Sequence, residues 1–310
     1  MSTLTKNKPW QEKLSVKFRK LLSGASDGIP PWLPVVAEGD EPGLFLPGDA
    51  PWIVHRDFAT LVGGIRALLM QALHPGSLAG VAQHSRYEQD PLGRLSGTIR
   101  WLTVTTFGSV TAIQNEANRV NRMHERVAGS YQKADGQTSS YRAADKDLLL
   151  WVHIAFMESF LRSHQAFSKT AIPGGADGYI NLWGKSVEPL GLSEVPSSEA
   201  ELNAQLDDYA KQLIVSEKTS EVINWIRNAP LPKQAKPVYK LLFHSAVASI
   251  DPRFRKLIGI RTAPLWILAP ITKNLLSLMR FAIGPESPIE DAAIQRLIRA
   301  GAVTGESLTR

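Results

Sequence analysis

Between residues 53 and 169 the chain repeats one pattern, in which apolar residues recur at helical spacing until a proline or glycine ends the segment. The first segment ends before Pro75, the second before Pro91 and the third at Gly108. Proline has no backbone N–H and its ring clashes with the preceding turn, so it does not continue a helix. No pair of segments alternates apolar and polar residues as paired strands do. We therefore expect an all-α fold of several helices.

The expected helices share this periodicity and comprise residues 52–73, 77–89, 91–108, 109–129, 143–169, 199–215, 220–229, 236–250 and 289–301. Ser109 is the expected N-cap, and Gly129 the expected C-terminal glycine, of the helix between them. Residues 131–141 are expected to form a polar loop. We divide the chain into residues 1–50, an amphipathic helix followed by a Pro- and Gly-rich loop, and residues 51–310, a single helical domain.

Composition restricts the chemistry that such a chain can perform. A net charge of +6 favours anionic partners, either a membrane surface or nucleic acid. The basic residues show neither zinc-finger spacing nor an RNP-like string, so we do not expect a nucleic-acid partner. The chain has no cysteine, which excludes disulfides, thiolate nucleophiles, iron–sulfur clusters and thiolate-ligated haem. A transition metal must therefore be bound through one or more of the seven histidines.

Two segments bear on membrane contact. Trp10, Leu14 and Phe18 share one helical face near the N-terminus, and the neighbouring lysines lie mostly off it. Residues 4–22 therefore form either a helix that rests on a membrane surface or a first helix that docks on the core. The apolar residues 263–284 are interrupted by prolines, so we expect this segment to be buried or interfacial rather than spanning. Because no apolar secretory signal is evident, we expect a cytoplasmic location, with peripheral membrane association as the open alternative.

His124 is the most informative histidine. Together with Ile113, Ala117 and Val120 it lies on one apolar stripe of the expected helix 109–129. Its ring nitrogens need partners there. Two interpretations stay open: a core histidine bonded to a carbonyl, or an imidazole ligand of haem iron. His153 shares a face with aromatic residues, and either packs with one hydrogen bond or lines a pocket beside His124.

Four further polar residues lie close together in the sequence. Arg94 and Thr98 are one helical turn apart, which suits a propionate or a dioxygen held above a metal. The alternative is an arginine paired with Asp90 and a threonine bonded to the backbone. His74 sits at a helix end, where histidine commonly caps carbonyls, whereas His84 lies mid-helix among small residues.

Three ordered motifs are similar to one family, the rubber oxygenases (latex-clearing proteins) and MpaB-type oxygenases, over about residues 50–170. The motifs are GGIRALLMQALHPGSLAGVAQHSRYEQDPLGRLSGT, RVNRMHERVAG and YRAADKDLLLWVHIAFMESFL. The resemblance implies a helical catalytic domain with a globin-like core that holds haem b. It also implies oxidative cleavage of carbon–carbon double bonds in isoprenoid chains, with O2 and a small apolar substrate as partners.

The resemblance also implies roles for individual residues. His124 matches the proximal axial ligand of the iron, and Arg122, in the same motif, is counted among the cofactor-binding residues. The other implied site residues are Arg94 and Thr98 near the haem, His153 in the haem environment, and His74 and His84, which line or brace the catalytic pocket.

The chain departs from the family pattern in two ways. Gly97 stands where relatives have a basic residue before the threonine, and the general base of the rubber enzymes is not located, with Glu88 as a nearby candidate. We therefore expect a haem b-dependent oxygenase. The alternative is a non-catalytic helical protein that binds haem or lipid at a membrane surface.

Overall fold

Two long helices, α4 (Ala59–Leu73) and α8 (Lys146–Phe167), pack along each other at the centre of the computed structural model, which describes residues 6–84 and 91–304. Gly63 permits the close approach of the two helices, because a Cβ atom there would lie 2.6 Å from Cδ1 of Phe160. Across the same contact Arg66 Nη2 donates to Glu158 Oε1 at 2.6 Å, and both side chains are buried. The contact between α4 and α8 therefore encloses a buried ion pair.

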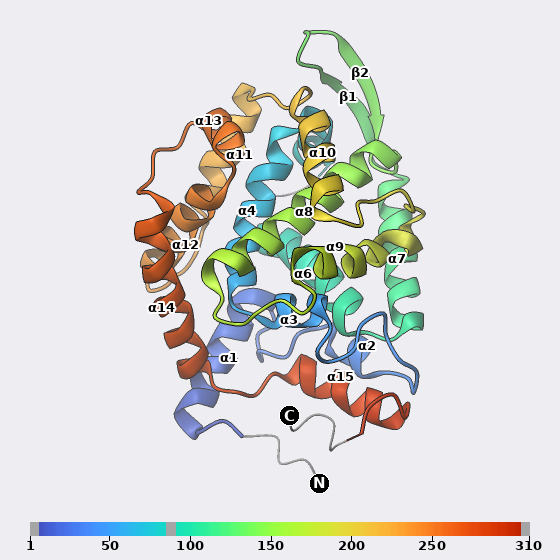
Figure 1. Cartoon of the computed structure of the whole chain (residues 1–310), viewed down its shortest axis with the longest axis vertical. Helices are drawn as coiled ribbons and strands as arrows, with labels where there is room; N and C mark the ends of the chain where they lie inside the picture. Colours follow the sequence, from blue (N-terminus) through green and yellow to red (C-terminus); the bar gives the residue numbers. More distant parts are fainter. Residues whose placement is uncertain (1–5, 85–90, 305–310) are drawn as a thin grey trace.

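Shorter helices and one strand pair surround α4 and α8 (Figure 1). They are α1 (Pro9–Ser23), α2 (Leu33–Ala37), α3 (Ala50–Arg56), α5 (Pro75–His84), α6 (Pro91–Phe107), α7 (Val110–His124), β1 (Ala128–Gln132), β2 (Thr138–Arg142), α9 (Gly175–Gly184), the 3-10 helix η1 (Lys185–Leu190), α10 (Glu199–Ala210), α11 (Glu217–Arg227), α12 (Lys236–Ser249), α13 (Pro252–Ile258), α14 (Leu265–Ile283) and α15 (Pro288–Arg299).

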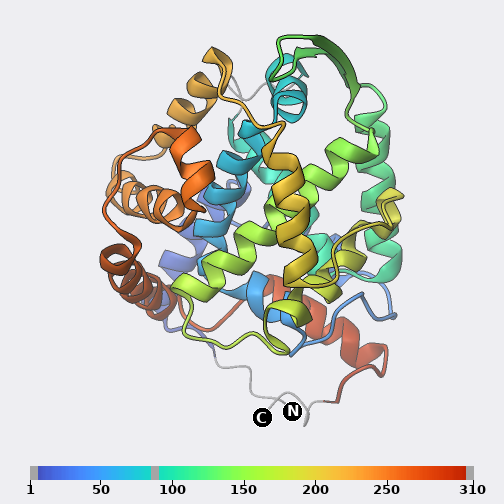
Figure 2. The ribbon, with the colours of Figure 1, turned by 45° about the horizontal axis from the view of Figure 1, so that its top comes forward.

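The surrounding helices fall into groups on different sides of the central pair. Helices α11, α12 and α13 contact α4, and α14 covers α12 and α8 on the same side (Figures 1 and 2). Helices α9 and α10 contact α8, while α7 lies beyond them against η1 and α6. At the lower end of the view in Figure 1, α15 packs on α2 and α6. The expected all-α fold is confirmed.

The C-terminal helix α15 holds the N-terminal loop onto the core. Its buried Arg296 donates to the carbonyl oxygens of Val36, at 3.2 Å, and Phe107, at 2.7 Å, and also to that of Glu41. Three buried carbonyls thus share one guanidinium, whose fork of donors suits several acceptors. The Pro- and Gly-rich segment is therefore packed against the helical body, and it contains the short helix α2.

The expected helix 52–73 is wrong in one respect, because it is divided into α3 and α4 at Asp57 and Phe58. The carboxylate of Asp57 accepts a hydrogen bond from the backbone N–H of Ala59 at 2.7 Å and another from Ser168 Oγ at 2.8 Å. A short polar side chain that caps the next helix competes with continuation of the previous one. The break turns α3 away from the axis of α4.

The expected polar loop at residues 131–141 is also wrong, since it forms most of an antiparallel hairpin of β1 and β2. Its turn contains Asp135 and Gly136, and Gly136 has φ +82°, a conformation that favours glycine. Helix α7 ends at His124, so Gly129 is not its C-terminal glycine but lies in β1, where a Cβ atom would meet Gln83 Oε1 at 2.3 Å. The hairpin projects from the helical body at the top of Figure 1.

Among the described residues, no single helix combines the length and the apolar character that crossing a membrane requires. Helices α14 and α15 meet the requirement only when they are taken together, and they are bent by 69° at the break between them.

Candidate functional site

His124 is the last residue of α7, and the helix is built to place it. Ser109 Oγ accepts from the backbone N–H of Ala112 at 3.1 Å, which confirms the expected N-cap. Ile113, Ala117 and Val120 are buried as the predicted stripe, and His124 follows them half-buried at the C-terminal end. The sequence pattern thus identified the face of α7 that points into the protein.

A buried carboxylate fixes α7 against α6. Glu116 is buried, and it forms ion pairs with Arg100 on α6 at 2.8 Å and with Arg119 on its own helix at 2.6 Å. Burial acts to raise the pKa of Glu116, but the hydrogen bonds and charges of Arg119 and Arg100 outweigh it, so the pKa lies below its usual value. The carboxylate therefore stays ionised at neutral pH and keeps the two helices in register.

The ring of His124 has one nitrogen that no described side chain or backbone group bonds. Its Nδ1 atom is buried and has no hydrogen-bond partner. Burial, with a smaller contribution from the Arg119 charge, lowers the pKa of the ring. A buried ring nitrogen without a partner is uncommon in a folded protein. The neutral imidazole is therefore available to a ligand or metal.

His153 shows the same property on α8. It is buried, its Nε2 atom has no hydrogen-bond partner, and burial lowers its pKa to about 3. The hairpin joins the helices of the two histidines, because the backbone N–H of Ala143, shortly before α8, donates to the carbonyl of Val127, shortly after α7, at 2.9 Å. Two neutral imidazoles, each with one buried nitrogen that has no hydrogen-bond partner, thus come from helices connected at the base of one hairpin.

His74 lies at the junction of α4 and α5, and its ring has protein partners. The backbone N–H of Ser77 donates to Nδ1 at 3.3 Å, and Nε2 lies 3.4 Å from Gln212 Oε1. The ring is buried beside Trp151, with centroids 5.9 Å apart, and burial lowers its pKa. Trp151 lies two residues before His153 on α8, so His74 braces the same part of that helix.

The structure gives fewer contacts for the remaining predicted site residues. Thr98 is half-buried on α6, and Arg122 is exposed in the last turn of α7. Gly97 has open space where a Cβ atom would be. The side chains of His84, Glu88 and Arg94 lie outside the residues that the structure describes, so their roles stay predictions.

No role is predicted from the sequence for His55, which the structure places in a chain of polar groups. Its Nδ1 atom lies 2.8 Å from Thr106 Oγ1, and its Nε2 atom lies 2.9 Å from the hydroxyl of Tyr179. Thr106 Oγ1 in turn donates to the carbonyl of Leu102, so His55 donates through Nδ1 and accepts through Nε2. Burial lowers its pKa to about 3. This histidine is satisfied and structural, in contrast to His124 and His153.

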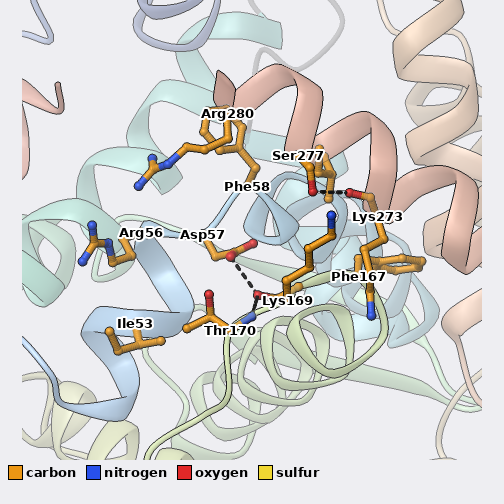
Figure 3. A pocket seen from close by; sticks show the side chains of 12 residues that line it. Ile53, Arg56, Asp57, Phe58, Phe167, Lys169, Thr170, Lys273, Ser277 and Arg280 are labelled. Carbon is orange, nitrogen blue, oxygen red and sulfur yellow. Dashed lines mark hydrogen bonds between the residues drawn. The ribbon is translucent and has the colours of Figure 1, made fainter. Parts of the chain in front are cut away.

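A cavity of about 530 Å³ lies between α3, the C-terminal end of α8 and α14 (Figure 3). Four cationic side chains and one carboxylate contribute to its lining: Arg56, Lys169, Lys273, Arg280 and Asp57. None of the predicted site residues lines it. It is therefore a separate feature of the molecule, on the side of α14.

In the part of the chain that the structure describes, no cluster of side chains is suited to hold a metal ion. No group of three or more His, Asp or Glu side chains lies close enough to hold a metal ion there. A porphyrin supplies four nitrogen ligands itself, so haem iron needs only one or two from the protein. The unpartnered nitrogens of His124 and His153, on a chain without cysteine, fit that requirement.

The fold defines the class, an all-α protein in which the buried His124 Nδ1 and His153 Nε2 atoms have no hydrogen-bond partner. The comparison with protein families identifies the family within it. Residues 52–285 match the family described as "ER-bound oxygenase mpaB/B'/Rubber oxygenase, catalytic domain". The chain belongs to this family, and the predicted resemblance is confirmed. Comparisons with curated proteins and with solved structures gave no significant match.

Proposed function

We propose that this protein is a haem b-dependent oxygenase that uses O2 to cleave a carbon–carbon double bond in an apolar, isoprenoid-like substrate. Membership of an oxygenase family supports the class of reaction. The observation that carries the haem assignment is the ring of His124, whose buried Nδ1 atom has no partner although the helix that bears it is firmly capped and paired.

The chain's own residues have distinct tasks in this proposal. His124 would hold the haem iron, and the Glu116 network keeps α7, which carries His124, in place against α6. Bound there, haem b supplies an iron centre that binds and activates dioxygen. Arg94 and Thr98, which match residues near the haem in the family, are proposed to position the reacting groups, with Arg122 as a further cofactor contact.

The burial of His124 and His153 suits both a metal-binding imidazole and an apolar substrate. A metal ligand must be the neutral imidazole, because a protonated ring nitrogen cannot coordinate. Burial lowers the pKa of His124 and brings that of His153 to about 3, so both rings stay neutral at physiological pH. Surroundings that exclude water so strongly from His153 also favour an apolar substrate over a charged one.

The second candidate is a non-catalytic protein that binds haem or lipid. It differs from the oxygenase in that it converts no substrate. Glu88, the candidate general base, lies outside the residues that the structure describes, and no general base is identified among the described residues. Oxidative cleavage places one oxygen atom on each carbon of the broken double bond and yields two carbonyl groups, and O2 provides both atoms without a reductant. Carbonyl products are therefore the property that separates the two candidates.

The test is incubation of the haem-loaded full chain with squalene under isotopically labelled O2, followed by mass spectrometry. The proposal predicts shortened aldehydes or ketones that carry labelled oxygen. The matched controls are the haem-free protein and squalane, which has the same carbon skeleton without double bonds; neither should give product. Stable haem binding without carbonyl products from any isoprenoid alkene would favour the non-catalytic protein instead.

A further inference from the structure

Helix α14 exposes a stripe of large apolar side chains. Trp266, Leu278 and Phe281 are 76%, 63% and 64% exposed, and Ile271 lies on the same outer face. The opposite face of the helix buries Leu268, Thr272 and Leu276 against the protein. Single apolar residues are common on protein surfaces, but several large ones exposed on one face of a helix indicate an interaction site.

Helix α1 extends the stripe. It packs beside α14 (Figure 2), where the rings of Trp10 and Phe281 lie 5.9 Å apart. The usual amphipathic arrangement is inverted in α1: polar Gln11 and Ser15 are buried, whereas Trp10 and Leu14 are exposed. Gln11 Nε2 donates to the carbonyl of Phe281 at 2.7 Å, so the polar face docks the helix and turns its apolar face outward.

The charges around this stripe have one predominant sign. Lys13, Lys17 and Lys20 are exposed next to Trp10 and Leu14 on the outer side of α1. Glu12, the one acidic residue of α1, forms an ion pair with Arg19 at 2.8 Å.

Helix α14 itself has no acidic residue. Its Lys273 and Arg280 line the cationic cavity along one flank of the stripe (Figure 3). The surface thus combines aromatic and aliphatic anchors with a cationic border.

We propose that this α1–α14 face, defined by Trp10, Leu14, Trp266, Ile271, Leu278 and Phe281 with its bordering lysines and arginine, docks the protein on an anionic phospholipid bilayer. Exposed Trp, Leu and Phe enter the interface between headgroups and acyl chains, while Lys and Arg pair with lipid phosphates and carboxylates. Charge complementarity favours this occupant over a second copy of the chain, since two cationic copies repel each other at this face.

The proposed contact is peripheral. α15, the partner of α14 in the bent apolar pair, buries Ala293, Arg296 and Leu297 against the protein. Most of the large exposed apolar side chains of that pair therefore belong to α14. This inference is independent of haem, so failure of either proposal leaves the other standing.

The test is flotation of the full chain with vesicles of phosphatidylcholine alone or with about one third phosphatidylserine. We expect binding to the anionic vesicles that falls as salt is raised, and release of the bound protein by alkaline carbonate. The variant Trp266→Ser/Leu278→Ser/Phe281→Ser should bind at least about tenfold less well, since it removes three anchors that interfacial binding requires. Lys13→Gln/Lys17→Gln/Lys20→Gln should lose the preference for anionic vesicles.

Matched control variants test whether binding depends on this face or on the total hydrophobicity and charge of the chain. Val110→Ser/Val215→Ser removes exposed apolar side chains elsewhere, and Lys133→Gln/Lys185→Gln/Lys233→Gln removes the same charge from exposed lysines on other segments. Both should bind as the unmodified protein does, and circular dichroism should show one melting profile for all variants. The proposal would be overturned if the control variants lost vesicle binding to the same extent, or if the bound protein resisted carbonate. It would also be overturned if the chain formed a lipid-free dimer that the α14 variant dissociates.

Discussion

Replacing His124 with alanine is expected to abolish stable haem binding. The imidazole is the proposed iron ligand, and loss of residues that merely support a metal ligand already lowers affinity by about 10- to 100-fold. We expect haem occupancy after gel filtration to fall at least about tenfold. The fold should survive, because the ring is half-buried at the end of α7 and its Nδ1 atom forms no hydrogen bond that would be lost.

The measurement is the ratio of haem to protein, from pyridine haemochrome absorbance and amino-acid analysis. His244→Ala is the matched control, since His244 is also half-buried on a helix, α12, but lies outside the predicted site. It should retain haem fully. Unchanged occupancy in His124→Ala, with circular dichroism like that of the unmodified chain, would contradict the ligand assignment.

Replacing Arg66 with methionine is expected to destabilise the fold by about 3–5 kcal/mol. The change leaves Glu158 buried between α4 and α8 without its main counter-charge, and an unpaired buried charge is strongly unfavourable. The measurement is urea unfolding followed by circular dichroism, with the free energy of unfolding extrapolated to water.

Two further variants test whether the unpaired charge of Glu158 is the cause of the lost stability. Arg162→Ala removes a half-exposed guanidinium 3.8 Å from the same carboxylate and should cost no more than about 1 kcal/mol. Arg66→Met combined with Glu158→Leu removes both charges and should recover most of the lost stability. If Arg66→Met unfolds at the same urea concentration as the unmodified chain, the ion pair does not hold the central helices together.

The sequence predicted most helices because their apolar spacing and their prolines act locally. The break at Asp57 was missed, since a carboxylate that caps the next helix and bonds to Ser168 across the fold leaves no mark in the apolar pattern. The hairpin was missed because β1 and β2 consist mainly of small and polar residues. Its one local signal was Asp135-Gly136, a dipeptide typical of tight turns.

The candidate site was predicted in part for a similar reason. Helical spacing placed Ile113, Ala117 and Val120 on a buried stripe of α7, which the structure confirms. His124 lies half-buried at the end of that stripe, and its role as a ligand stays a prediction. Spacing could not distinguish His124 and His153, which each have one unpartnered ring nitrogen, from the satisfied rings of His55 and His74, because the partners come from distant segments.

The exposed face of α14 was beyond prediction for a related reason. The apolar composition of residues 263–284 is evident in the sequence, but which side of the helix is covered depends on where α1, α8 and α12 pack.

The most direct test of the central claim, that His124 serves a haem-dependent oxygenase, is the absorption spectrum of the purified full chain during titration with haemin. We predict a Soret band that saturates at one haem per chain, with the ferrous and carbon monoxide spectra of histidine-ligated haem b. A titration that shows only the broad absorbance of free haemin, with no saturable component, would contradict the account.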